Sequence, residues 1–296
     1  MVNQYFPLLC KGGVSRPKRR DGVIKPLLIK PLFSKILNNI SPILFYTLKD
    51  RITLSRGLYF ISNTDYQFME YIKVNERNSV LKGYNMLLYF AGSMIMYEPV
   101  EECVVDFWSK GILKALPVKS SNPRFVKAAS QLRDSCEDKS VCKRMLQEDF
   151  RRLFSDSGLP LAPPLKSNYI DIPVSNGLKA ENVSDFYNSY GWHKRTRYNI
   201  PDDNLGIELL FLTLLNDRYI ALEDKACRRE MRNEIRRFIR LHILSWLPEW
   251  NERMQEYAVT PGYKAIATLI YACCEDVFDL LDDSDLKFDF SSGLRN

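Results

Sequence analysis

The stretch 200–215 constrains the fold more than any other part of the sequence. It opens with a proline and two carboxylates, Asp202 and Asp203, and continues as a run whose polar side chains are few, Glu208 and Thr213 among them. A helix that is apolar on nearly every side belongs in the middle of a helical core. Asp203 is expected to cap its start, because acidic side chains accept hydrogen bonds from the free N–H groups of a first turn.

Two interpretations of this helix stay open at the level of periodicity. Asn204, Glu208 and Phe211 share one face of the helix, which sets polar groups beside apolar surface where the helix begins. The plainer interpretation is a capped core helix whose Glu208 pairs internally, and periodicity alone favours it. The other is that the polar first turn belongs to a binding site.

Charge is distributed unevenly along the 296 residues. Residues 1–68 hold 11 Lys and Arg against 3 Asp and Glu, a balance of +8, whereas residues 69–296 hold 31 against 33, a balance of −2. The larger part therefore lacks the basic surface that nucleic-acid binding requires. A hydrophobic content of 46% predicts a well-formed core.

The first 68 residues differ in pattern from the rest, and we expect a basic, loosely organised extension there. Three interpretations compete: sequence upstream of a true start at Met69, a mobile arm, or a segment that contacts a membrane surface. No uncharged apolar run reaches the roughly 20 residues of a membrane-spanning helix, and no cleavage site indicates a secretory signal.

Cysteine and histidine usage argues against a metal site. The seven cysteines are scattered, no C-x-x-C pair occurs, and the two histidines are His193 and His242. We therefore expect reduced thiols, as in a cytosolic protein, and no structural zinc. His242 lies on an apolar helical stripe, where a hydrogen-bonded core histidine is the plainer interpretation and a catalytic base the alternative.

Apolar periodicity predicts an all-α bundle. Residues 155–183 hold four prolines and no sustained period, so a long Pro-rich loop is expected between the N-terminal and C-terminal halves. The helices are predicted at 72–97, 99–110, 123–137, 140–154 (capped by Ser140), 184–190, 203–222, around the stripe 235–246, from Pro248, and 261–281 (capped by Thr260). Phosphate-binding glycine loops, H-E-x-x-H and G-x-S-x-G are all missing from the sequence, so an enzyme is poorly supported.

Five segments, in order, resemble the motifs of one family. They are 150–154 (Phe-Arg-Arg-Leu-Phe), 162–169 (Ala-Pro-Pro-Leu-Lys-Ser-Asn-Tyr), 201–212, 238–248 and 260–263. Each is weak alone, but together they span roughly residues 69–285. The chain resembles the TorD/DmsD/NarJ family of cytoplasmic chaperones for molybdenum oxidoreductases.

The resemblance implies a non-catalytic chaperone without a cofactor of its own. Such proteins bind the twin-arginine signal peptide and the apo catalytic subunit of a dimethyl sulfoxide reductase-type enzyme, and delay export until the molybdopterin cofactor is inserted. The family's peptide-binding positions correspond here to Phe150, Leu153, Phe154, Pro164, Ser167, Asp203 and Asn204. We expect Pro201 and Asp202, in the same turn, to complete the signal-peptide site.

This sequence departs from the family pattern at three positions: Ile200 replaces Glu, Asn204 replaces His, and Leu165 replaces Trp. Asp202 can partly replace the lost charge. A twin-arginine peptide carries two guanidinium groups before an apolar segment, so carboxylates beside an apolar surface suit it. The alternative is a helical adaptor with no export role. The 155–183 loop would also allow a domain-swapped dimer instead of a monomer.

Overall fold

The computed structural model describes residues 63–100, 116–136, 138–155, 159–170, 182–194 and 199–282. Contacts between Cα atoms divide the chain into residues 1–70 and 71–296, and the account below concerns the second unit. Most of the predicted extension 1–68 and nearly all of the predicted helix 99–110 lie outside the described residues. Within those residues, no helix is long and apolar enough to cross a membrane.

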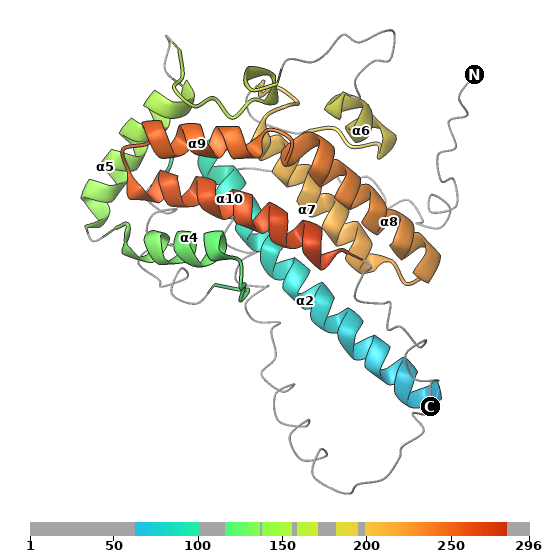
Figure 1. Cartoon of the computed structure of the whole chain (residues 1–296). Helices are drawn as coiled ribbons and strands as arrows, with labels where there is room; N and C mark the ends of the chain where they lie inside the picture. Colours follow the sequence, from blue (N-terminus) through green and yellow to red (C-terminus); the bar gives the residue numbers. More distant parts are fainter. Residues whose placement is uncertain are drawn as a thin grey trace, which may run out of the picture. The chain divides into compact units, whose positions relative to one another are not determined.

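The described residues form an all-α fold, as the sequence predicts (Figure 1). An isolated bridge between Leu165 and Asn204 is the one piece of strand-like pairing in this part of the chain. The α-helices are α2 (Asn63–Met96), α4 (Pro123–Asp134), α5 (Lys139–Phe150), α6 (Val183–Ser189), α7 (Leu205–Ala221), α8 (Lys225–Phe238), α9 (Leu247–Tyr257) and α10 (Pro261–Leu280).

Three short helical segments complete this description. Two are π-helical and continue a preceding α-helix, namely η6 (Arg151–Ser155) after α5 and η8 (Ile239–Ile243) after α8. The third is the 3₁₀ turn η7 (Lys166–Asn168) within the expected Pro-rich loop. Around η7, residues 159–165 are extended or bent, while 171–181 lie outside the described residues. A π-turn adds one residue to a helical turn, which a search for 3.6-residue periodicity does not detect.

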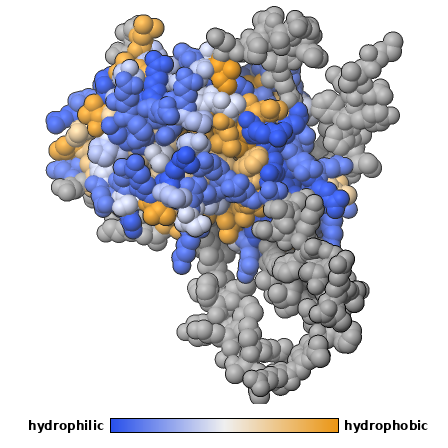
Figure 2. Space-filling view, in the orientation of Figure 1, coloured by the Kyte–Doolittle hydropathy of each residue, from blue (hydrophilic) through white to orange (hydrophobic). Residues whose placement is uncertain are grey.

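α7 and α10 form the centre of the bundle. Nearly every residue of the first half of α7 is buried, including Leu205, Ile207 and Leu209, which confirms the prediction of a helix inside the core. α10 packs against α4 and α9, and α7 packs against α8 (Figure 1). On the face in Figure 2, apolar residues form separate patches among polar ones, as on most folded proteins.

α2 and α7 approach closely because each has a glycine at the contact. A Cβ added to Gly206 would lie 3.1 Å from the carbonyl oxygen of Gly92 and closer still to Met96. Further along, Asn85 donates to the carbonyl of Thr213 and accepts from Asn216, which ties the two helices together with buried hydrogen bonds. This pairing fixes where the first turn of α7 lies.

Two predicted helix caps are wrong by a residue or two. Asn204, not Asp203, caps α7, since its side-chain oxygen accepts from the N–H of Gly206 at 2.9 Å. Asp138, not Ser140, caps α5, since its carboxylate accepts from two backbone N–H groups of the first turn. In both places the sequence offers neighbouring residues able to cap, and the path of the backbone selects one.

The expectation that all cysteines are reduced is also wrong for one pair. Cys136 and Cys142 form a disulfide across the turn that joins α4 to α5. Cys227, Cys273 and Cys274 are free thiols, and the last two are buried in α10. The sequence does not reveal this pair because the two cysteines are six positions apart, a spacing that resembles no redox or metal motif.

Candidate functional site

Backbone hydrogen bonds bring together three of the segments that carry the predicted site. We call residues 162–167 the proline segment. Its N-terminal end pairs with η6, where the N–H of Ala162 donates to the carbonyl of Leu153 at 3.0 Å. Its C-terminal end pairs with the turn before α7, where Leu205 N donates to Pro164 O at 2.8 Å. The motif 150–154, the proline segment and residues 201–204 are thus contiguous in space.

The predicted residues on this surface differ widely in exposure. Phe150, Leu153 and Pro164 are buried, so they support this surface from the protein interior. Phe154 is half-buried between two rings, those of Phe150 at 5.3 Å and Tyr263 at 5.5 Å. The exposed or half-exposed members are Ser167, Pro201, Asp202 and Asp203. A ligand at the surface would therefore meet the turn and Ser167 first.

The two neighbouring carboxylates have different partners. Asp202 forms an ion pair with Lys194 at 2.5 Å and accepts a hydrogen bond from the hydroxyl of Ser184 at 2.7 Å. Although burial opposes it, these two contacts hold the pKa of Asp202 below its usual value. The carboxylate of Asp203 accepts from the N–H of Ser167 at 3.1 Å and forms no ion pair with the described residues. Asp203 is thus the more available carboxylate for a cationic ligand.

Asn204 has a structural role at this site. It is 7% exposed, its side chain caps α7, and its backbone forms the bridge with Leu165. The bridge therefore joins Leu165 and Asn204, two of the three positions that depart from the family pattern. The third, Ile200, has a carbonyl that accepts from the ammonium of Lys194.

Two buried titratable groups lie behind this surface, and neither has the partner expected from sequence. Glu208 is 0% exposed and His242 is 1% exposed. Among the described residues, no group donates a hydrogen bond to either Glu208 oxygen, and neither ring nitrogen of His242 is bonded. The prediction that Glu208 pairs internally and that His242 is a hydrogen-bonded core residue is wrong in this respect, although both residues are in the core.

Burial determines the protonation of both groups. It raises the pKa of Glu208 well above the usual range, and the charge of Lys166 opposes this. Burial, together with the charges of Lys166 and Arg237, lowers the pKa of His242 to about 4. The imidazole of His242 is therefore uncharged near neutral pH.

Sequence reasoning missed three residues that organise the site. Lys194 and Ser184 hold Asp202, and Lys166 donates from its ammonium to the carbonyl of Leu241 at 2.8 Å. Lys166 lies inside the motif 162–169, where it is a cation in a loop otherwise rich in proline. No sequence signal points to Lys194 or Ser184, because their role depends on how α6 and the turn pack.

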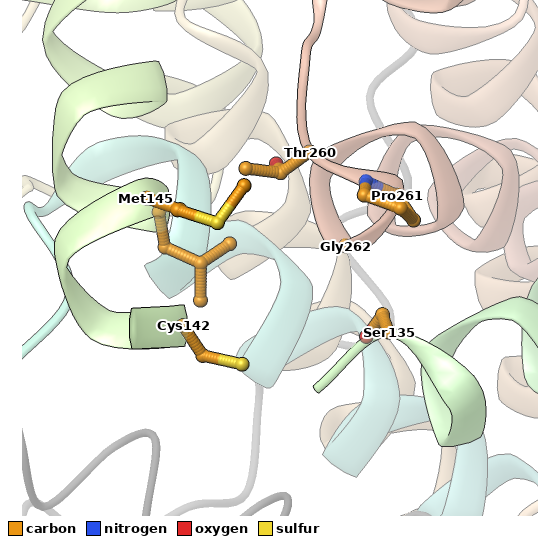
Figure 3. A pocket seen from close by; sticks show the side chains of 7 residues that line it. Ser135, Cys142, Met145, Thr260, Pro261 and Gly262 are labelled. Carbon is orange, nitrogen blue, oxygen red and sulfur yellow. The ribbon is translucent and has the colours of Figure 1, made fainter. Parts of the chain in front are cut away.

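A shallow pocket is found elsewhere and shares no residue with the predicted site. It lies where α5 meets the start of α10, and Figure 3 shows Met145 extending from α5 toward Thr260, with Cys142 on the same helix. Ser135, Leu146 and Gly262 complete its lining. Groups of three or more metal-ligating side chains are not found in the described part of the chain.

Comparisons with known proteins find one matching family and several relatives. The profile of the nitrate reductase delta subunit family matches residues 120–252. The chaperone protein TorD of Vibrio cholerae serotype O1 (strain O395) is 26% identical over 200 residues, which cover 67% of this chain and 91% of that protein. TorD of Vibrio vulnificus (strain YJ016) is 29% identical over 165 residues, covering 55% and 75%. TorD of Aliivibrio salmonicida is 22% identical over 209 residues, covering 68% and 96%.

The described residues are all-helical, and the relatives that the chain resembles are named chaperones, not enzymes. The chain is similar to chaperone protein TorD over about two thirds of its length, and residues 120–252 match the nitrate reductase delta subunit family. The profile match includes the motif 150–154, the proline segment and residues 201–204.

Proposed function

We propose that this chaperone binds the twin-arginine signal peptide and the apo catalytic subunit of a dimethyl sulfoxide reductase-type molybdenum enzyme. It acts in the cytoplasm and delays export of that enzyme until the molybdopterin cofactor is inserted. The observation that carries this proposal is the junction of the proline segment with residues 203–205 through two backbone hydrogen bonds and the Leu165–Asn204 bridge. It sets the available carboxylate of Asp203 beside a wall of buried apolar side chains.

The chemistry of the peptide matches this surface. A twin-arginine signal presents guanidinium groups and then an apolar stretch, and Asp203 supplies a carboxylate near apolar surface. Burying roughly 400 Å² of apolar peptide surface would contribute on the order of 10 kcal/mol. Association and ordering of the peptide would cost about 4–15 kcal/mol, which offsets most of this gain. An arginine–carboxylate pair at an exposed edge adds only about 0–1 kcal/mol, so charge would orient the peptide more than hold it.

The test is calorimetric titration with a synthetic twin-arginine signal peptide. Asp203→Ala is expected to weaken binding by up to about fivefold, with unchanged far-UV helicity. Asp203→Asn separates the two roles of this residue, because it retains an acceptor for the Ser167 N–H and loses the charge.

Asp185→Asn is the matched control, since it removes an exposed carboxylate from α6 and should bind like the wild type. Equal affinity of the wild type and both Asp203 variants would remove this residue from the site. Recovery of a molybdoenzyme precursor with its signal intact in a pull-down would support the chaperone over a helical adaptor.

A further inference from the structure

Glu208 is an acidic group of the core whose oxygens accept no hydrogen bond within good geometry from the residues that the structure describes. Both of its oxygens are buried, and the indole N–H of Trp246, which lies near enough to affect its pKa, donates instead to the carbonyl of His242 at 2.6 Å. Leaving a buried polar group unsatisfied costs about 1–3 kcal/mol, and few such groups occur in native proteins. An apolar residue at this position would avoid that cost, so the carboxyl group requires an explanation beyond packing.

The positive charge that faces Glu208 comes from the proline segment. Lys166 is the charged group that most opposes the effect of burial on the pKa of Glu208, and it also acts on His242. The ammonium of Lys166 donates to the carbonyl of Leu241 in η8. The backbone of the same residue donates to the carbonyl of Asp203 at 3.1 Å. The side chain of Lys166 is thus held at η8 while its backbone is paired with the turn before α7.

The proline segment thus has the features of a bound peptide. Residues 163–165 are not helical, Leu165 pairs in an antiparallel bridge with Asn204, and Lys166, which begins η7, carries a cation whose charge acts on Glu208. Addition of an extended segment to an open backbone edge is a common way for proteins to bind peptides. A twin-arginine peptide in extended form offers the same combination of backbone pairing and positive charge.

We infer that the proline segment occupies, within its own chain, the position that the signal peptide takes, and that Glu208 receives one arginine guanidinium when Lys166 moves away. This rests on the proposed function above, because it assigns a partner group to that peptide. A guanidinium is planar, permanently charged and able to donate two parallel hydrogen bonds, so it would satisfy both Glu208 oxygens at once. Lysine cannot do so in the same geometry.

Binding in this way would release protons. Burial holds the pKa of Glu208 above its usual value while the proline segment covers it, and ionisation against the guanidinium would release a proton, so affinity for the peptide should rise with pH. The other groups around Glu208 do not change charge near neutral pH. Burial raises the pKa of Tyr187 in α6 and of Cys274 in α10, and His242 in η8 has its pKa at about 4. Lys166 and Asp203 supply the fixed charges nearby.

The experiment is a cycle between protein and peptide variants, measured by calorimetry with the full chain. The peptides are a twin-arginine signal and the two versions in which one arginine is replaced by glutamine. The wild type should bind one of these two substituted peptides about tenfold or more weakly than it binds the twin-arginine peptide. For Glu208→Gln, the same substitution in the peptide should weaken binding by less than about twofold. Glu252→Gln, which changes an exposed carboxylate on α9, should behave as the wild type.

Proton release provides a readout that needs no variant. Titrations in two buffers of different ionisation enthalpy should show net release from the wild type, and Glu208→Gln should show none. Equal arginine dependence in the wild type and Glu208→Gln, or the absence of proton release from the wild type, would overturn this inference while the proposed function stands. Failure of the wild type to bind any twin-arginine peptide would overturn both.

Discussion

Leu165 and Asn204 form an antiparallel bridge that joins the proline segment to the first turn of α7. Asn204 contributes its backbone to this bridge and its side chain to the cap of the helix. A single residue therefore connects a surface segment with the most buried helix of the C-terminal half.

The first prediction concerns this cap. Asn204→Ala should lower the free energy of unfolding by about 1 kcal/mol, because the N–H of Gly206 loses its acceptor. Asn204→Asp retains an acceptor at the same place and should lose clearly less. Urea denaturation followed by far-UV circular dichroism measures both. Equal stability of the alanine variant and the wild type would show that the cap contributes nothing.

The second prediction concerns pH and His242. Its folded-state pKa of about 4 lies below the ordinary value of 6.5, so the unfolded chain binds a proton more readily. The stability linked to this group is fully present above about pH 6.5 and is lost as pH falls towards 4. Since each pKa unit is about 1.4 kcal/mol, the loss amounts to about 3 kcal/mol.

His242→Gln tests this, because glutamine does not titrate in that range. The difference in unfolding free energy between the wild type and the variant should change between about pH 6.5 and 4 and stay constant above. Glu208 contributes the opposite trend at higher pH, since its folded-state pKa is raised, but it does so in both proteins. A difference independent of pH would contradict the assignment.

The third prediction compares two glycines of α2. A Cβ at Gly83 would lie 2.5 Å from Val118 and 2.9 Å from the backbone oxygen of Pro117, whereas at Gly92 the nearest atom would be 3.6 Å away. Gly83→Ala should destabilise the protein by about 1–3 kcal/mol through overpacking. Gly92→Ala should be neutral or stabilising by up to about 1 kcal/mol, from helix propensity. Thermal unfolding of the two variants and the wild type, measured in parallel, tests this difference. Equal melting temperatures of Gly83→Ala and Gly92→Ala would contradict the prediction.

Much of the fold could be predicted from the sequence because apolar periodicity and caps are local signals. Asn122 and Thr260 each cap a helix that begins with proline, and both caps are found where such a pattern places them. Asp203 and Ser140 were misassigned because they lie beside equally good capping residues. The π-turns at the ends of α5 and α8 carry no separate residue signature.

The candidate site could be predicted only in part. The motifs around Phe154, Ser167 and Asp203 gave the segments that meet, but not which side chains are buried and which remain available. The missing partner of Glu208 depends on the position of Trp246, whose N–H is taken by a backbone carbonyl from the preceding turn. Such a conflict arises from tertiary packing and leaves no trace in a window of sequence.

Asp149 links the wall of the site to the last helix of the bundle. Its carboxylate, next to Phe150 in the chain, accepts from the N–H groups of Val259 and Thr260 and from the hydroxyl of Thr260, which caps α10. Any ligand that displaces η6 would pull on this carboxylate and loosen the start of α10. Amide hydrogens at the first turn of α10 would then exchange faster with solvent. Ligand binding at the candidate site could therefore be detected as reduced protection of backbone amides at the start of α10.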